Sequence, residues 1–285
     1  MTGDAGSIGL IAGQGRLPML VADGMRREGL RVCAVGLSQQ YEDDLLPMCA
    51  SFKKVGVFRV AQWARVLRRM GAEQAVMVGR VDKARLMHGP FRYFRAVPDL
   101  PTLRMWYGRL RHDHRSPAVL AAIADILSDH GITLIDSTTH IPEQMASAGT
   151  MTTREPSDQC RRDIAFGWSV LQGSISLGVG QAIAVREGDV IAVEAVEGTD
   201  RMIQRAGELC RRGGWTLLKT CAADHDRRAD VPTIGEQTVR TAADAGCACI
   251  AVGAGDVIIV DKPQTLALAD ELGVAVVGLT AGDAG

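Results

Sequence analysis

The stretch IGLIAGQGRLP, residues 8–18, decides how the first half of this chain is interpreted. It passes from the apolar run 8–12 through Gly13, Gln14 and Gly15 to Pro18. A short apolar run next to glycines is typical of a buried strand, and proline suits the first helical turn, whose N–H groups lack partners within the helix. The stretch therefore predicts a strand, a tight turn and a helix that continues to about Arg27.

The same alternation continues along the first half of the chain. We expect strands at residues 32–37, 74–78 and 132–136, an apolar segment at 55–58, and helices at 61–70 and 118–130. Strands that alternate with helices of this length imply a parallel sheet. We therefore predict an α/β fold that begins with a Rossmann-like N-terminal domain over residues 1–137.

The second half is organised differently. Residues 138–160 are polar without periodicity and are interpreted as a linker to a C-terminal α/β domain over 161–285. Segments 180–186 and 190–196 flank a glycine turn and predict a β-hairpin. Helices are expected at 200–212, 236–245 and 264–272, and strands at 215–220, 249–252, 257–260 and 274–278. The hairpin beside parallel units predicts a mixed sheet.

Composition excludes several classes of protein. Lysine and arginine number 32 against 33 acidic residues, so no overall field favours nucleic acid. No apolar run approaches the roughly 20 residues of a membrane span, and the first residues lack signal-peptide character. The 7 scattered cysteines indicate buried reduced thiols in a cytosolic protein, and Cys247 and Cys249 are expected on one face of a strand.

The run Asp224-His225-Asp226-Arg227-Arg228-Ala229-Asp230 is the strongest chemical signal. It follows the apolar stretch 215–219, and α/β folds keep their chemistry just past the ends of buried strands. Its carboxylates are the hard oxygen ligands that Mg²⁺ and Mn²⁺ prefer. The alternative is a solvated surface turn.

Two glycine turns are candidate phosphate sites. Gly13 and Gly15 could bring backbone N–H groups to a phosphate, although a plain tight turn explains them equally well. Pro18 stands where a dinucleotide fingerprint has its third glycine, which disfavours NAD and leaves sugar nucleotides open. Gly79 and Arg80 follow the strand 74–78, so Arg80 or Lys83 could hold a phosphate at the same edge of the sheet, although exposed basic residues in a loop usually have no specific role.

A further candidate site joins a strand to a helix at residues 197–200. Thr199 suits the N-cap and Asp200 the first turn, so capping alone explains both, while the functional alternative is a diphosphate held at the helix N-terminus. Glu194 and Glu197 face opposite sides of a regular strand, and Glu197 is chosen for the site. Lys219 either reaches solvent or pairs a phosphate oxygen.

Residues 91–111 interleave aromatic and arginine side chains. A packed insertion, a membrane interface or lid, and a nucleic-acid stacking surface all fit this pattern, and the packed insertion is favoured. The residues are Phe91, Arg92, Tyr93, Phe94, Arg95, Arg104, Trp106, Tyr107, Arg109 and Arg111.

Three motifs taken together resemble the LpxI-type UDP-2,3-diacylglucosamine pyrophosphatases. They are the stretch 8–18, the pair GQAIAV at 180–185 and VEAVEGTD at 193–200, and Lys219 with DRRADVPTIG at 226–235. The motifs follow the order of that family and span essentially the whole chain. His225 stands in place of the family's glutamine, and Cys221-Ala-Ala replaces its upstream lysine-proline.

The resemblance implies a cytoplasmic, Mg²⁺-dependent hydrolase of lipid A biosynthesis. Water would attack the β-phosphorus of UDP-2,3-diacylglucosamine, giving 2,3-diacylglucosamine 1-phosphate (lipid X) and UMP. The family implies a homodimer with the ligand cleft between the two domains of each chain. A substrate with two acyl chains also implies peripheral contact with the inner membrane surface, and residues 91–111 are the candidate acyl-chain lid or membrane contact.

Site residues follow from the motifs. Asp226 matches the family's essential aspartate and is expected as metal ligand or as the carboxylate that orients water. Arg227, Arg228 and Asp230 are expected to orient the loop. The expected substrate-binding residues are Gly13, Gly15, Gly79, Arg80, Glu197, Thr199, Asp200, Lys219 and Thr233. The alternatives are a non-catalytic regulator that binds sugar nucleotides and an NAD-dependent oxidoreductase.

Overall fold

The computed structural model describes residues 6–81, 98–111, 116–228, 230–280 and 282 of the chain. It consists of two compact units: Met1–Ile141 with Asp226–Asp230, and Pro142–His225 with Val231–Gly285. The chain therefore passes between the units three times. A short piece of the second half, which includes Asp226, belongs to the first unit.

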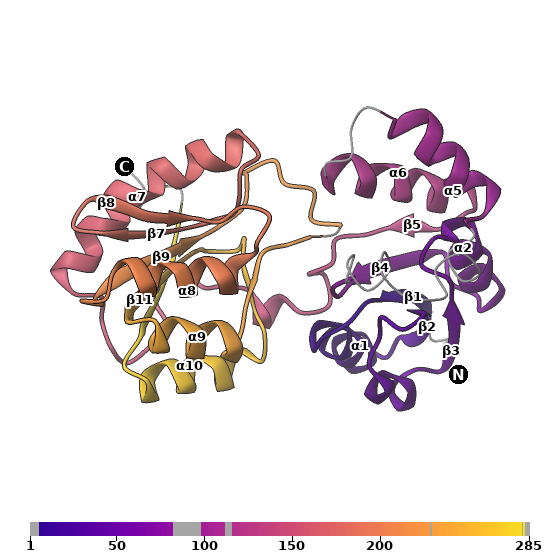
Figure 1. Ribbon diagram of the computed structural model, residues 1–285. Coiled ribbons are helices and arrows are strands. Elements are labelled where there is room, and N and C mark those ends of the chain that lie inside the picture. The colour runs from indigo at the N-terminus through magenta and orange to yellow at the C-terminus, as the bar shows by residue number, and fades with distance from the viewer. Residues whose placement is uncertain (1–5, 82–97, 112–115, 229, 281, 283–285) are drawn as a thin grey trace. The chain divides into compact units, whose positions relative to one another are not determined.

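The first unit is built on a five-stranded sheet of order β3-β2-β1-β4-β5, in which every pairing is parallel (Figure 1). Its strands are β1 (Ser7–Ala12), β2 (Arg31–Leu37), β3 (Ser51–Val55), β4 (Gln74–Val78) and β5 (Thr133–Leu134). The predicted parallel sheet is confirmed. Its order reverses between β1 and β4, and open sheets of this kind bind ligands at the carboxyl ends of the strands at that switch.

Helices cover both faces of this sheet. Helix α1 (Leu17–Arg27) lies on one face, and α2 (Val60–Arg69) and α6 (Ser116–Asp129) lie on the other, as right-handed crossovers require (Figure 1). Helix α2 buries Val60, Trp63 and Leu67, spaced three and four residues apart, on the sheet. A 3₁₀ helix, η1 (Asp43–Met48), connects β2 to β3.

Two parts of the first unit differ from the sequence prediction. Strand β3 ends at Val55, where the apolar segment 55–58 was expected to begin. The prediction missed this edge strand because its exposed residues Lys53 and Lys54 interrupt the apolar pattern. Lys83 and residues 91–97 of the aromatic segment lie outside the described residues. The described part forms helix α5 (Leu100–Arg104) and a π-helical turn, η2 (Met105–Arg109).

The second unit contains a mixed sheet of order β6-β13-β11-β9-β7-β8. Strands β9 (Trp215–Lys219), β11 (Cys247–Gly253) and β13 (Ala275–Leu279) are parallel, and β7 (Ala182–Arg186) and β8 (Asp189–Val193) form the predicted antiparallel hairpin beside them. Strand β6 (Gly149–Thr150) pairs antiparallel with β13. Strands β10 (Thr233–Ile234) and β12 (Ile258–Ile259) form a separate parallel pair.

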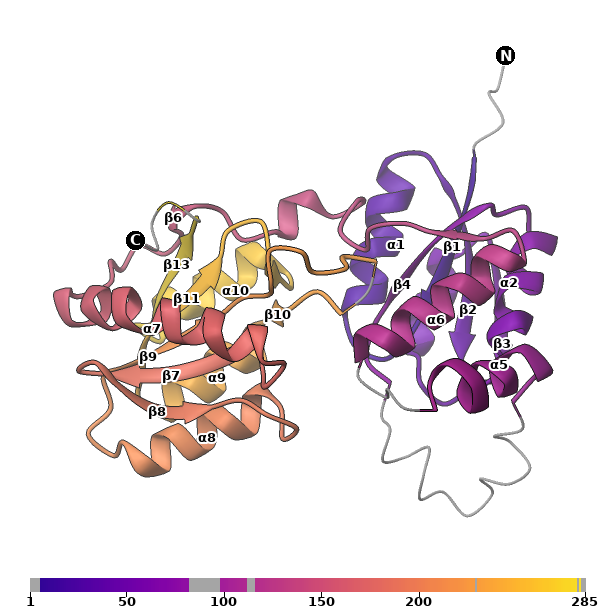
Figure 2. The ribbon, with the colours of Figure 1, turned by 90° about the horizontal axis from the view of Figure 1, so that it is seen from above.

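Helices enclose the second sheet as well. Helix α7 (Asp158–Ser176) covers one face, and α8 (Thr199–Leu209), α9 (Glu236–Asp244) and α10 (Lys262–Glu271) cover the other (Figures 1 and 2). The expected linker 138–160 contains η3 (Pro142–Gln144), β6 and the start of α7. Helix α7 was not predicted, since exposed residues such as Phe166 obscure its apolar stripe.

The prediction that Cys247 and Cys249 share a face is wrong. A β-bulge between them shifts the register of β11 against β9. Cys247 consequently packs in the core under α8 and α9, and Cys249 in the core under α7. An inserted residue reverses side-chain alternation beyond it, which a count of positions cannot reveal. Both thiols are buried and free, as expected.

Candidate functional site

The glycine turns after β1 and β4 meet at the switch point of the first sheet. Gly13 N donates to Val78 O at 2.8 Å, and Gln14 N donates to Arg80 O at 2.8 Å. Arg80 N returns a bond to Gln14 O at 3.0 Å. The structure thus brings together the four predicted residues of this unit's turns, Gly13, Gly15, Gly79 and Arg80.

The glycines serve two different purposes. A Cβ on Gly13 would lie 2.7 Å from Arg80 O, and one on Gly79 would lie 2.6 Å from the Gly13 carbonyl carbon, so both glycines permit the close approach of the turns. Gly15 has a φ of 97° and open space around it. Its N–H donates to Glu42 Oε1 at 3.1 Å, so this N–H already faces an anion.

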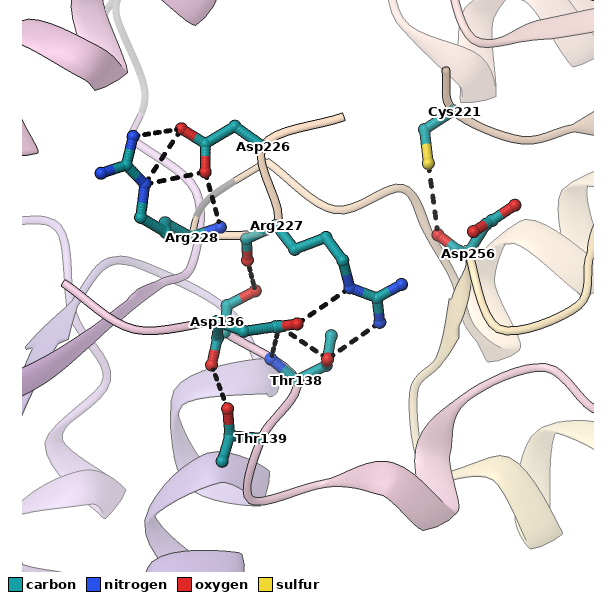
Figure 3. A network of polar contacts seen from close by, with 9 residues as sticks. Asp136, Thr138, Thr139, Cys221, Asp226, Arg227, Arg228 and Asp256 are labelled. Atoms are coloured by element: carbon teal, nitrogen blue, oxygen red, sulfur yellow. Dashed lines mark hydrogen bonds and ion pairs between the residues drawn. The ribbon is translucent and has the colours of Figure 1, made fainter. Parts of the chain in front are cut away.

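The loop that carries Asp226 docks against the end of β5, the strand beside β4 (Figure 3). Arg227 Nε lies 2.9 Å from Asp136 Oδ2, and Arg227 Nη2 donates to Thr138 Oγ1 at 3.0 Å. Ser137 donates to the Arg227 carbonyl from its N–H and its hydroxyl, each at 2.9 Å. Arg227 therefore holds the loop at the carboxyl edge of the first sheet.

Arg228 holds the Asp226 carboxylate within this loop (Figure 3). Its guanidinium donates to both oxygens, with Nη2 2.6 Å from Oδ2 and Nε 2.9 Å from Oδ1, and its backbone N–H donates to Oδ1 at 3.1 Å. The hydrogen bonds that the guanidinium donates to Asp226 raise the pKa of Arg228. Because the Asp226 side chain is 37% exposed, an incoming ligand can reach the ion pair and replace one of its partners.

A second polar cluster lies in the second unit, around Lys219 at the end of β9. Lys219 is 6% exposed, and its Nζ donates to Thr199 Oγ1 at 2.8 Å and to the Thr233 carbonyl at 3.0 Å. Thr199 Oγ1 donates in turn to Glu194 Oε1 at 2.7 Å. The other oxygen, Glu194 Oε2, is buried without a hydrogen-bond partner among the described residues. We call Lys219, Thr199, Thr233 and Glu194 the lysine network.

The structure places Glu197, chosen from the sequence, outside this network. Glu197 Oε1 pairs with Arg205 Nη2 at 2.6 Å, and Oε2 accepts from Ala195 N at 3.1 Å. A hydrogen bond from its own N–H, helped by Arg205, lowers the pKa of Glu197. The alternation argument failed because β8 ends at Val193, so neither glutamate belongs to a regular strand.

Thr199 differs from expectation, whereas Asp200 lies in the first turn of α8 as predicted. The N-cap of α8 is Gly198, with a φ of 83°, and Thr199 is the first helical residue. Its hydroxyl is thereby available to Lys219 and Glu194. Asp200 is exposed in the first turn of the helix. The signal that could have found Glu194 is its position directly after β8 and five residues before Thr199, from which it accepts a hydrogen bond.

Few side chains that could bind a metal ion lie close together in the described parts of the two units. Those parts contain no group of three or more His, Cys, Asp or Glu side chains placed to hold a metal ion. Asp224 is exposed, and Asp230 adopts a left-handed φ of 62°. Mg²⁺ often takes one or two protein carboxylates and completes its shell with substrate phosphates and water. The partly exposed Asp226 carboxylate fits that kind of site.

None of the helices in the described residues combines the length and apolar character needed to cross a membrane. The longest of those helices, α7, has 19 residues and carries several charged side chains.

Comparison with known proteins gives one clear relative. The chain is 29% identical over 280 residues to the UDP-2,3-diacylglucosamine pyrophosphatase LpxI of Caulobacter vibrioides, covering 95% of this chain and 97% of that protein. Two structures of the biotin carboxylase domain of 2-oxoglutarate carboxylase, one of them from Hydrogenobacter thermophilus, overlap at TM-scores of 0.25 and 0.26. They are 12% and 13% identical to this chain, and the matches cover 62% and 72% of this chain and 34% and 41% of theirs. At these TM-scores the overlap does not indicate a shared fold.

The family models agree with that relative along nearly the whole chain. The model of the LpxI N-terminal domain matches residues 7–144, and the model of the LpxI C-terminal domain matches residues 147–277. The two matches adjoin where the chain first leaves the first compact unit, near Ile141. The chain belongs to the LpxI family.

Proposed function

We propose that this protein hydrolyses the diphosphate of UDP-2,3-diacylglucosamine to lipid X and UMP in lipid A synthesis. The observation that carries the proposal is the docking of the Asp226 loop at the carboxyl edge of the first sheet, where α/β enzymes bind their ligands. The name of the Caulobacter relative supplies the substrate.

In the proposed reaction, water attacks the β-phosphorus. A new P–O bond forms to the water oxygen, the bond from phosphorus to the bridging oxygen breaks, and UMP leaves with that oxygen. Asp226 would act on this step in one of two roles. It would accept a hydrogen bond from the attacking water and take its proton, or it would hold a divalent cation while that proton passes to solvent. Either role needs its carboxylate close to phosphorus.

Arg228 would prepare Asp226 for this role. In the structure its guanidinium occupies both carboxylate oxygens. A diphosphate competes well for a guanidinium, because arginine binds phosphate through paired hydrogen bonds. Transfer of Arg228 from Asp226 to the substrate would free the carboxylate only when substrate is bound.

The lysine network would bind a phosphate group on the second unit. Lys219 lies at the N-terminal end of α8, and both the ammonium and the helix dipole favour an anion there. Thr199 and the Thr233 carbonyl fix the lysine, so little side-chain entropy is lost on binding. On the first unit, the Gly15 N–H and Arg80 are the proposed contacts for the nucleotide.

Mg²⁺, or Mn²⁺ in its place, is the proposed cofactor, with Asp226 as its protein carboxylate. When bound, such an ion neutralises phosphate charge and lowers the pKa of coordinated water. Mn²⁺ binding measured on wild type and Asp226→Asn separates the two roles of Asp226: lost binding identifies a ligand, and retained binding identifies the base.

We also propose a cytoplasmic location with peripheral contact to the inner membrane, and a homodimer. The lipid substrate supports the first proposal, because it resides in the bilayer. Light scattering during size-exclusion chromatography tests the second, with a monomer mass as the contradicting result.

The decisive test of the activity is incubation with UDP-2,3-diacylglucosamine, Mg²⁺ and ¹⁸O-labelled water. We expect UMP to be released, with the label in the phosphate of lipid X. Label in UMP would place the attack at the α-phosphorus. Binding without hydrolysis would instead support a sugar-nucleotide regulator. A parallel reaction with EDTA, which removes the metal ion, tests whether hydrolysis depends on it.

A further inference from the structure

A cationic hollow lies on the first unit beside its edge strand β3. It measures about 390 Å³ and lies between β3, the outer side of α2 and the start of α5. Its charged lining consists of Lys53, Arg59, Arg65, Arg69 and one acid, Asp99. All four cationic side chains belong to exposed residues.

The one acid of the lining, Asp99, forms an ion pair with Arg65, in which Arg65 Nη2 lies 4.0 Å from Asp99 Oδ2. Asp99 Oδ1 accepts from the Thr102 N–H and hydroxyl at 3.2 and 2.6 Å, and Oδ2 accepts from Gln62 N at 3.0 Å. The carboxylate therefore caps α5 and joins α5 to α2, where helix N-termini already share its charge. One carboxylate cannot balance four cations, so the lining keeps a net positive charge.

An apolar ridge continues from this hollow along α5 and η2. Leu100, Leu103 and Tyr107 are 59%, 39% and 73% exposed and recur at helical spacing, and Trp106 beside them is 44% exposed. On the other side Thr102 and Met105 are buried against the unit. Large apolar side chains exposed beside a group of cations are typical of proteins that lie on a bilayer.

We infer that this surface, the hollow with Lys53, Arg59, Arg65 and Arg69 together with the α5–η2 ridge, docks on an anionic bilayer. The cations would meet lipid phosphates, and Leu100, Leu103 and Trp106 would enter the headgroup layer. Nucleic acid also attracts cations, but exposed leucines add nothing to phosphate or base contacts, so a bilayer is the better match. The choice of occupant rests on the proposed function, whose substrate carries acyl chains.

Vesicle binding tests this inference without using the reaction. The full chain is mixed with vesicles of phosphatidylcholine alone or with phosphatidylglycerol added, and bound protein is measured by co-sedimentation. Each basic residue close to an anionic bilayer adds to the electrostatic attraction between protein and lipid. Removing two of them in Arg65→Gln/Arg69→Gln should therefore lower partitioning onto the vesicles by about tenfold or more. The matched control is Arg26→Gln/Arg27→Gln on α1, which covers the opposite face of the sheet and should change little.

Tryptophan fluorescence gives a second readout. Trp63, Trp168 and Trp215 are buried, so Trp106 is the tryptophan that a bilayer can reach. Brominated lipids should quench wild type, and Trp106→Phe should abolish that quenching. Equal vesicle binding by the Arg65/Arg69 and control variants, or unquenched Trp106, would overturn the inference, as would RNA binding that depends on these arginines without vesicle binding. Failure of UMP release from detergent-solubilised substrate would refute the proposed function and leave vesicle binding to be judged separately.

Discussion

The Asp226 loop and the lysine network place charged groups past strand ends in two different ways. Asp226 pairs with Arg228, only 2 residues away, and both side chains remain partly exposed. Lys219 is buried and bonded to residues 20 and 14 positions away in the sequence. A carboxylate held by a close neighbour can change partners, whereas a lysine fixed by distant segments keeps its position. We therefore expect the loop to carry the proposed chemistry and the network to contribute to substrate binding.

The largest effect is expected for Asp226→Asn. The amide keeps the size of the side chain and can still accept from Arg228 N, but it cannot take a proton or hold a cation strongly. Loss of such a group typically costs 10²–10⁴-fold, so kcat should fall by about a thousandfold. Steady-state UMP release measures this fall.

Arg228→Gln is the matched control for that variant, because it removes the partner and keeps the carboxylate. We expect a smaller loss of kcat together with a raised KM, since Arg228 is proposed to transfer to the substrate. Full activity in Asp226→Asn would remove the loop from the reaction.

The next effect tests how the loop is docked. Arg227→Ala removes the contacts to Asp136 and Thr138, and we expect kcat to fall by about tenfold to a hundredfold, since small misplacements of reacting groups are costly. A double-mutant cycle with Asp136→Ala measures the coupling: the two losses should not add. Additive losses would mean that Arg227 acts without Asp136.

The lysine network should affect binding more than chemistry. Lys219→Met keeps the aliphatic stem and removes the ammonium. Hydrogen bonds to charged groups contribute about 1.5–3 kcal/mol, so KM should rise by roughly tenfold to a hundredfold with little change in kcat. Thr199→Val should show the same pattern more weakly. A fall in kcat alone would place this lysine in the reaction step.

The smallest changes in KM are expected for substitutions of the two glutamates, Glu194 and Glu197. Glu194→Gln alters the carboxylate that accepts from Thr199, and we expect KM to change by about threefold to tenfold. Glu197→Gln changes an exposed ion pair with Arg205, and such pairs contribute little, so its KM should stay within about twofold of wild type. A larger effect at Glu197 would restore the assignment made from the sequence.

Local patterns predicted much of the fold. The apolar run 8–12, the helix after Pro18 and the hairpin around the Glu187–Gly188 turn are all determined by nearby residues, and they appear as β1, α1 and β7–β8. Strand β3 and helix α7 escaped prediction because exposed lysines interrupt one and exposed apolar residues obscure the other. The β-bulge at Cys247 has no sequence signal of its own.

The parts of the candidate site that lie at strand ends were also predictable from local patterns. Lys219 and the turns at Gly13 and Gly79 stand at strand ends, so their place at a carboxyl edge followed from the alternation. The choice of Glu194 over Glu197 depends on where β8 stops, and strand ends are poorly marked in a sequence. The docking of Arg227 on Asp136 joins residues 91 positions apart, which only the folded chain reveals.

Substrate affinity and the rate of a single turnover, measured together on Asp226→Asn and Lys219→Met, test the division of roles most directly. Equilibrium binding of UDP-2,3-diacylglucosamine gives the first quantity, and UMP formation with enzyme in excess gives the second. The account predicts that Asp226→Asn binds substrate nearly as wild type does and hydrolyses it very slowly. Lys219→Met should bind weakly and, at saturating substrate, react at close to the wild-type rate. The opposite pattern, weak binding in Asp226→Asn and slow turnover in saturated Lys219→Met, would contradict it.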